Sequence, residues 1–208
     1  ENFCEQGSEV YFVDKNDNES KKLIDLINKK NLKIPTFFKC DLTDIVKLQS
    51  VISKINSEKK TIDVVVNNAA NDERHTTDEV DEDYWDNRMA VNLKHYFFTI
   101  KATKDKMIKK GNGSIVNLGS VSWMMGEGDK VVYETAKSAI VGLTRSFARE
   151  LGHYNIRSNS IIPGSIATER QIKNWLTPDY KKSILEKQCL KRQLKPEDVA
   201  NMVLYLSS

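Results

Sequence analysis

The sequence predicts an α/β domain built around a doubly wound parallel sheet. First, short runs rich in β-branched and aromatic residues alternate with helix-like stretches, at residues 9–14, 36–41, 62–68, 114–120 and 157–162. Second, residues 62–66 are apolar at almost every position, as expected for a strand that helices cover on both faces. Third, 208 residues with 39% hydrophobic content can bury one full core without cross-links.

The elements follow one another in an alternating order. The strand EVYFVD leads into a turn and a helix from about Glu19, and TFFKCD and IDVVVNN are the next strands, with another helix between them. The long helix expected over residues 81–110 should bend, and Gly111 with Gly113 should end it by permitting left-handed backbone. The strand GSIVNLGS, a helix that contains Tyr133 and the strand RSNSII complete the pattern.

Both ends of the sequence read as incomplete parts of this pattern. The opening ENFCEQGSEV reads as the end of a helix that enters its next strand, and the closing LYLSS reads as a helix end with no strand after it. We therefore expect residues 1–208 to form a single three-layered, Rossmann-like dinucleotide-binding domain that lacks its first strand, with the Gly-rich phosphate loop, and its last strand. The alternative is a chain that truly lacks this loop and binds no dinucleotide.

Composition argues against several classes of function. The net charge of +3 and the 29% of charged residues predict solvated helix faces, residues 104–110 included, and no nucleic-acid binding. The cysteines Cys4, Cys40 and Cys189 have no metal-type spacing, so we expect no metal site and reduced thiols. No apolar run approaches about 18 residues and no signal peptide opens the chain, which predicts a cytoplasmic protein without membrane contact.

Three residues within SVSWMMGEGDKVVYETAK can form an acid–base site. On a helix, Lys137 lies one turn after Tyr133 on the same face, where its charge would lower the phenol pKa from about 10 towards working pH. Ser120, at the end of a strand, could bond the substrate oxygen that Tyr133 protonates or deprotonates. The spacing alone is weak evidence, because Tyr11 and Lys15 repeat it where no helix is expected.

With these residues, three further motifs support a resemblance. They are NNAA at residues 67–70, Asn92 within the long helix, and PGSIAT at residues 163–168. The whole chain resembles the short-chain dehydrogenase/reductase family of nicotinamide-dependent oxidoreductases. The resemblance implies that Ser120 orients the substrate oxygen, that Tyr133 is the general acid/base, that Lys137 also holds the nicotinamide ribose, and that Asn92 anchors a water that leads protons from Lys137.

The cofactor-binding residues follow from the same resemblance and from position. Asp14 ends its strand, where its carboxylate could bind both adenosine ribose hydroxyls and repel a 2′-phosphate. This favours NAD over NADP, although Lys15 partly offsets the repulsion. The resemblance places the adenine at Asp41 and Leu42, although a helix N-cap near Asp41 or Thr43 is a competing interpretation. It also places on the cofactor the residues Asn68, Ala69, Ala70, Pro163, Gly164, Ile166 and Thr168. The family usually has Gly where Ala70 stands.

The loops expected to face the substrate are polar and aromatic. A ligand with many hydroxyl groups needs hydrogen-bonding and aromatic side chains of this kind. In these loops they are Asn71, Asp72, Arg74, Trp123, Glu127, Gln171 and Trp175. Of these, the predicted substrate contacts are Asn71, Trp123, Glu127, Gln171 and Trp175. The stretches NNAANDERH, GSVSWMMGEG, ATERQIKNWLTP and QCLKRQLKPEDVA resemble the aldose 1-dehydrogenases of this family.

The predicted activity is oxidation of an aldose at its C1 hydroxyl to the lactone, with NAD as hydride acceptor and Tyr133 as general acid/base. One alternative is a carbonyl reductase, for example of 3-oxoacyl thioesters. Another is a cofactor-sensing or scaffold protein without catalysis. The resemblance also implies a homo-oligomer, a tetramer or a dimer, because helices such as the one at residues 133–151 should present apolar residues to a neighbour.

Overall fold

The computed structural model describes residues 1–58 and 61–208, and its parallel strands and flanking helices confirm the predicted α/β class. Within these residues the strands form two parallel sheets. They are β1 (Tyr11–Asp14) with β2 (Thr36–Lys39), and β3 (Val64–Asn67), β4 (Gly113–Leu118) and β5 (Ile156–Ile161) in the order β3-β4-β5. Each strand overlaps a run that the sequence predicted, although β5 begins one residue before its run.

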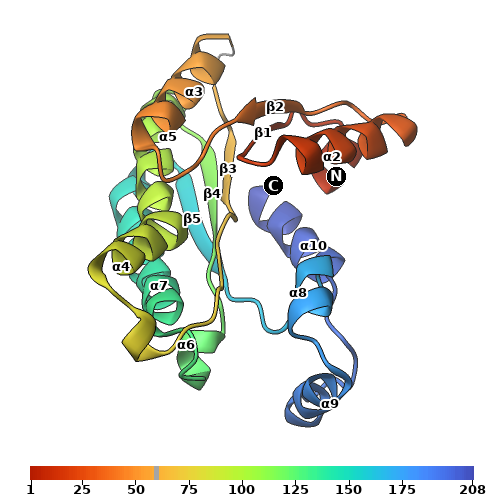
Figure 1. Ribbon diagram of the computed structural model, residues 1–208. Helices are drawn as coiled ribbons and strands as arrows, with labels where there is room; N and C mark the ends of the chain where they lie inside the picture. The colour runs from red at the N-terminus through yellow and green to blue at the C-terminus, as the bar shows by residue number, and fades with distance from the viewer. Residues whose placement is uncertain (59–60) are drawn as a thin grey trace.

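Helices join and flank these strands (Figure 1). They are α1 (Asn2–Glu5), α2 (Asp17–Lys29), α3 (Ile45–Glu58), α4 (Glu82–Met89), α5 (His95–Lys110), α6 (Ser122–Met125), α7 (Val131–Leu151), α8 (Glu169–Asn174), α9 (Pro178–Lys187) and α10 (Pro196–Ser207). Helix α2 begins close to the predicted position because the Asn16 side chain accepts from the backbone N–H groups of Asn18 and Glu19. Of the helices in the described ranges, none has both the length and the apolar character needed to cross a bilayer.

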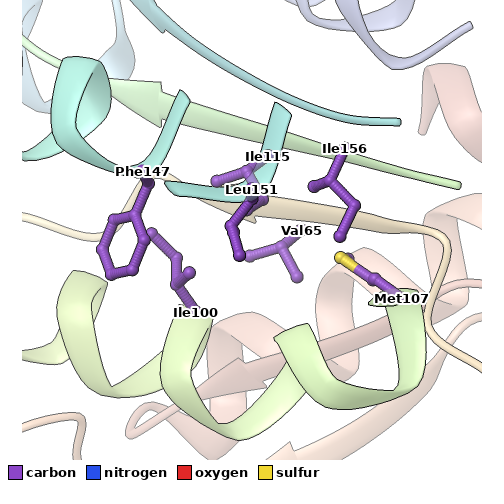
Figure 2. Close-up of a cluster of buried hydrophobic side chains, with 7 residues drawn as sticks. All are labelled: Val65, Ile100, Met107, Ile115, Phe147, Leu151 and Ile156. Atoms are coloured by element: carbon purple, nitrogen blue, oxygen red, sulfur yellow. The ribbon is translucent and has the colours of Figure 1, made fainter. Parts of the chain in front are cut away.

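The larger sheet is covered on both faces, as the predicted three layers require. Every residue of β4 is buried, and its side chains alternate between the two faces. On one face a cluster joins the sheet to α5 and α7 (Figure 2), through Val65, Ile100, Met107, Ile115, Phe147, Leu151 and Ile156. On the other face Val116 and Leu118 pack against Val203 of α10. Figure 1 shows α5 and α7 on one side of this sheet and α10 on the other.

The described strands divide into two sheets, whereas the sequence predicted a doubly wound parallel sheet without its first and last strands. Strands β1 and β2 pair in register from Tyr11 opposite Thr36 to Asp14 opposite Lys39. Among the described residues no strand ladder joins this pair to β3, and in Figure 1 the pair lies beside α2, away from β4 and β5. Apolar patterning identified each strand but not its hydrogen-bonded neighbour. The strand predicted to precede β1 stays a prediction.

The long helix is bent at a single place. Residues Ala90–Lys94 form a π-helical turn between α4 and α5, which confirms the predicted bend and gives its cause. Gly111 ends α5 in the left-handed region, with φ of 71°, also as predicted. The prediction for Gly113 was wrong: it begins β4, its φ is not positive, and a Cβ there would lie 2.8 Å from the Met107 Sδ atom. Close packing against α5, not backbone conformation, calls for a glycine at this position.

Candidate active site

The candidate site lies at the carboxyl end of the larger sheet, the edge at which open parallel sheets bind their ligands. Asn67 ends β3 opposite Asn117 of β4, and the Asn67 Nδ2 donates to the Asn117 Oδ1 over 2.9 Å. The Asn117 Nδ2 in turn donates to the Thr144 Oγ1 of α7 over 3.0 Å. This buried chain of side chains ties both strand ends to the helix that carries Tyr133 and Lys137.

Tyr133 and Lys137 lie in the first two turns of α7 on one face, as the spacing predicted. The Lys137 Nζ lies 5.6 Å from the centroid of the Tyr133 ring. Lys137 is 2% exposed, and its ammonium donates to the Leu118 carbonyl over 2.7 Å and to the Tyr96 hydroxyl over 3.2 Å. A buried cation is therefore held beside the phenol.

The pKa values of both groups are set mainly by burial. Burial raises the pKa of Tyr133 to about 12; a hydrogen bond from Ser120 lowers it in part, and the Asp72 charge raises it further. Burial lowers the pKa of Lys137 to about 8, and Asp72 opposes that shift. The predicted lowering of the Tyr133 pKa was therefore wrong, because withdrawal of the phenol from water raises that pKa.

Ser120 stands directly after β4, in the turn that leads into α6. Its Oγ lies 2.9 Å from the Ser122 Oγ and accepts from the Ser122 backbone N–H over 3.2 Å. The preceding Gly119 donates its N–H to the Ile161 carbonyl of β5 over 2.8 Å. These bonds fix the Ser120 hydroxyl beside the Tyr133 phenol.

Asn92 lies fully buried in the π turn and contacts the loop after β3. Its Oδ1 accepts from the Asn71 N–H over 2.8 Å, and its Nδ2 donates to the Asn71 carbonyl over 3.1 Å. The side chain thus fixes a loop that borders the site, which the sequence did not indicate. The water that Asn92 is expected to anchor stays a prediction.

The residues expected at the adenosine end lie at the carboxyl ends of β1 and β2. Asp14 is exposed, and its Oδ1 accepts from the Asn16 N–H over 2.8 Å. Asp41 accepts from both the backbone and the hydroxyl of Thr43, which hold the pKa of its carboxyl below the usual value. The competing N-cap interpretation was wrong, because Asp44 makes the cap bond to the Lys47 N–H. Leu42 packs against the cluster of Cys40, Leu48 and Ile52.

The other predicted cofactor residues follow β3 and β5. Asn68 and Ala70 are exposed at the end of β3, and the Ala69 carbonyl lies 3.1 Å from the His95 Nε2. After β5, the Pro163 carbonyl accepts from the Val121 N–H, a Cβ at Gly164 would meet the Leu194 side chain at 3.6 Å, and Ile166 forms a parallel bridge with Leu194. The Thr168 hydroxyl caps α8 by accepting from the Gln171 N–H over 3.2 Å. Contact of these residues with a cofactor stays a prediction.

Two of the predicted substrate residues, Asn71 and Gln171, are linked through Asp72 and Arg170 at the start of α8. The Gln171 Nε2 donates to the Asp72 Oδ2 over 2.5 Å, and Arg170 pairs with the same carboxylate over 3.3 Å. Arg170 also donates to the Asn71 Oδ1 over 3.3 Å. Segments 99 residues apart in the sequence therefore meet beside Tyr133, where the Asp72 charge acts on the phenol.

The tryptophans and Glu127 lie further along the same loops. The Arg74 guanidinium stacks 4.7 Å from the centroid of a Trp175 ring. The Nε1 atoms of Trp123 and Trp175 are buried without a hydrogen-bond partner among the described residues. Glu127 is exposed and forms an ion pair with Lys130. The predicted contacts of these three residues with a substrate stay untested.

The sequence did not single out two buried residues beside the site. The His75 Nε2 accepts from the Val132 N–H over 3.3 Å, and its Nδ1 lies 2.9 Å from the Tyr84 hydroxyl. Since Lys130 offers no side-chain cap to α7, His75 supplies one from another segment. Tyr96 is the other such residue, in contact with Lys137. A lone His and an aromatic residue in a helix carry no signal by themselves, because both contacts depend on tertiary packing.

A half-buried tyrosine and a buried lysine one helical turn apart, with a serine hydroxyl at the carboxyl edge of a parallel sheet, define an acid–base site of an α/β oxidoreductase. A family model described as enoyl-(acyl carrier protein) reductase matches residues 1–208. The chain belongs to the short-chain dehydrogenase/reductase family, as the motifs predicted, and is therefore an oxidoreductase that uses a nicotinamide cofactor.

Two relatives named as sugar dehydrogenases cover almost the whole chain, and a reductase covers most of it. D-xylose 1-dehydrogenase of Caulobacter vibrioides is 42% identical over 206 residues, which are 99% of this chain and 81% of the relative. A probable galactose dehydrogenase of Rhizobium meliloti is 38% identical over 208 residues, which are 100% of this chain and 81% of the relative. The 3-oxoacyl-[acyl-carrier-protein] reductase of Thermotoga maritima is 35% identical over 168 residues, 81% of this chain and 68% of the relative.

Among solved structures, a putative short-chain alcohol dehydrogenase from Sinorhizobium meliloti superimposes with a TM-score of 0.89 at 29% identity. The match covers 98% of this chain and 80% of that one. The arrangement of strands and helices described above is therefore that of the family.

Proposed function

We propose that this protein oxidises an aldose at its anomeric carbon, giving the lactone, with NAD as the hydride acceptor. The observation that carries the proposal is the pair of half-buried Tyr133 and buried Lys137 beside Asp72 and Gln171, a polar wall suited to a ligand with several hydroxyl groups. The relatives that match 99–100% of the chain are named for oxidation of xylose and galactose, which supports a sugar as substrate.

The donor set fits a nicotinamide dinucleotide. An ammonium has three N–H donors, and among the described residues two of those of Lys137 are used, which leaves one for a ribose hydroxyl. The exposed Asp14 carboxylate, at the end of β1, would accept from the adenosine ribose hydroxyls and repel a 2′-phosphate. Asn68, Ala69 and Ala70 present small or polar side chains where the dinucleotide would lie. Pro163, Gly164, Ile166 and Thr168 would border its nicotinamide end.

When bound, the oxidised nicotinamide accepts the hydride and brings a positive charge into the site. For its part, the protein moves the proton. Tyr133, as phenolate, takes the proton of the C1 hydroxyl while the C1–H bond breaks with its electron pair and the C1–O double bond of the lactone forms. Ser120 would donate to the same oxygen and fix its position. Lys137 and the cofactor charge both favour the phenolate, which opposes the effect of burial on Tyr133.

Reduction of a carbonyl, such as a 3-oxoacyl thioester, is the second candidate. It would use the same residues in the reverse direction, and the reductase relative at 35% identity supports it. That match covers 81% of the chain, whereas the sugar dehydrogenases match 99–100% of it. The third candidate, a scaffold without catalysis, finds no support in a site where Tyr133 lies beside the buried Lys137 and hydrogen-bonded side chains fix the surrounding loops.

The test is absorbance at the reduced-nicotinamide band, with NAD and NADP each offered against a panel of pentoses, hexoses and 6-deoxyhexoses. Reduction of NAD by one or a few aldoses supports the proposal and identifies the substrate. Absence of NAD or NADP reduction across the panel, together with oxidation of NADPH by a 3-oxoacyl thioester, would reject the proposal and support carbonyl reduction as the function. Neither activity, with no NAD binding by calorimetry, would favour the scaffold.

Three further statements stand as predictions beside this one. Residues 1–208 are expected to form one dinucleotide-binding domain, the protein to be a homo-oligomer, and its location to be the cytoplasm. Sedimentation and localisation of the tagged protein would test the last two.

A further inference from the structure

Tyr96 is fully buried in α5 and touches the catalytic lysine. Its hydroxyl lies 3.2 Å from the Lys137 Nζ and donates to the Leu118 carbonyl over 3.1 Å. Lys137 donates to the same carbonyl over 2.7 Å. Three groups from α5, α7 and the end of β4 thus form a closed triangle inside the protein.

The directions of these hydrogen bonds follow from the chemistry of the groups. A carbonyl can only accept and an ammonium can only donate. The hydroxyl proton of Tyr96 points at Leu118, so a lone pair of its oxygen faces the ammonium. Burial raises the pKa of Tyr96 far above the usual value, so it stays a neutral phenol and accepts a hydrogen bond without taking the proton.

We propose that Tyr96 is a positioning residue for Lys137: its hydroxyl oxygen holds the ammonium in its charged form beside Tyr133 and aims the remaining N–H of Lys137 at the ribose. This inference deepens the proposed function and rests on the use of Lys137 there. A buried lysine without such acceptors tends to lose its proton. The ammonium would then be a neutral amine during part of the reaction, and Tyr133 would lose a cation that favours its phenolate.

Other titratable groups near the ammonium are few. Tyr133 lies on α7 and Asp72 on the loop after β3, where its charge raises the pKa of Lys137. His95, next to Tyr96 on α5, has its pKa lowered to about 4 by burial and is neutral at working pH. The Glu134 charge raises the pKa of Tyr133. Of these groups, only Asp72 raises the pKa of Lys137 through its negative charge, and its carboxylate also contacts Arg170 and Gln171.

The direct test is Tyr96→Phe, which removes the hydroxyl and keeps the ring. Loss of one acceptor should lower the pKa of Lys137 by about 1 unit from its value of about 8, because a hydrogen bond to a charged group is among the stronger kinds. Less cation at a given pH raises the pKa of Tyr133. The pH midpoint of kcat/KM for aldose oxidation should therefore move up by a similar amount, with the Kd for NAD changed less than threefold. Tyr205→Phe, at an exposed position on α10, is the matched control.

A readout independent of turnover separates this inference from the proposed function. Nitrogen-15 NMR of the lysine Nζ follows the titration of Lys137 in both variants, whether or not the protein oxidises sugars. An unchanged Lys137 titration in a folded Tyr96→Phe protein would overturn the inference, and an active enzyme with an unshifted pH profile would do the same. Failure of every aldose to reduce NAD, with the Lys137 titration shifted as expected, would reject the proposed function alone.

Should Tyr96→Phe fail to fold, the unsubstituted protein still decides the question. The carbon-13 resonance of the Tyr96 Cζ reports the hydrogen bonds of its hydroxyl. We expect it to move through a midpoint near pH 8, as Lys137 loses its proton. A resonance that is constant across that range would show that the hydroxyl does not accept from the ammonium, and the inference would fall.

Discussion

Asn92 and Asn71 form a reciprocal pair, in which the Asn92 side chain both accepts from and donates to the Asn71 backbone. The π turn within the long helix presents Asn92 to this loop, which lies directly before Asp72. The loop is thereby held from one side by Asn92 and from the other by Gln171 and Arg170 of α8. The Asp72 carboxylate consequently has a fixed place near Tyr133.

Neutralising this carboxylate should change the pH dependence of the reaction. Asp72 raises the pKa of Tyr133, so Asp72→Asn should lower it and move the pH midpoint of aldose oxidation down, by about half a unit. The same change also lowers the pKa of Lys137, which would limit the shift. The measurement is kcat/KM against pH.

Glu73→Gln is the control for this prediction. Glu73 is the next residue of the same loop, exposed and paired with Arg88 over 2.9 Å. Glu73→Gln removes an equal charge at a side chain that does not contact the site, so the pH midpoint of kcat/KM should not shift in this variant. Equal shifts in both variants would mean that the loop charge acts only at long range, against the assignment of Asp72.

Cofactor preference should depend on Asp14. Asp14→Ala removes the carboxylate that would repel a 2′-phosphate, so the ratio of kcat/KM for NAD over NADP should fall by about tenfold or more. Asp25→Ala, at an exposed position of α2, should leave the ratio as it is. An unchanged ratio in Asp14→Ala would reject the assigned function of this residue.

His75 should stabilise the start of the helix that carries Tyr133. Its ring nitrogen caps the Val132 N–H, so His75→Leu should cost about 1 kcal/mol in the free energy of unfolding and reduce kcat more than it raises KM. The amide oxygen of His75→Gln can reach the same donor and should restore most of both losses. Denaturant unfolding and steady-state kinetics test this. Equal losses in the Leu and Gln variants would show that the hydrogen bond from the Val132 N–H to His75 contributes neither to stability nor to turnover.

Acid should destabilise the fold through His95. Its imidazole has a folded-state pKa of about 4, because it is buried, whereas the unfolded chain binds a proton near the ordinary value of 6.5. Stability is therefore complete above about pH 6.5 and is lost as pH falls towards 4, by roughly 3 kcal/mol. His95→Gln should weaken this slope in denaturant titrations, whereas His153→Gln, at an exposed site, should not. Parallel slopes in all three proteins would contradict the assignment.

The sequence was sufficient for the five strands and the helices between them, but not for α6, α8 and α9 or for the pairing of the strands. Consecutive apolar residues located β3, since burial of both faces leaves a strong pattern in the chain, and turn signals helped to locate β4 and β5. The bend near Asn92 was expected from helix length, although its π turn has no pattern of its own. The pairing of β1 with β2 alone could not be read, because ladders join residues distant in sequence.

At the site, the spacing along one helix predicted which residues share a face, but the sequence did not predict how burial changes their pKa values. Tyr133 and Lys137 share a face because four residues make about one turn, a local property. The pKa of Tyr133 rises because chain segments far away in sequence enclose the phenol. For the same reason no sequence pattern marked Tyr96, whose partners lie on β4 and α7, or the contact of Asp72 with α8.

The most direct test of the account compares the unsubstituted protein with Tyr133→Phe. With saturating NAD and the aldose that reduces it best, hydride transfer is followed at the reduced-nicotinamide band, and NAD affinity is measured by calorimetry. The account predicts a turnover loss of at least about 100-fold with almost unchanged affinity for NAD, because only the proton acceptor is removed. Turnover close to that of the unsubstituted protein would contradict the assignment of Tyr133 as the general acid/base.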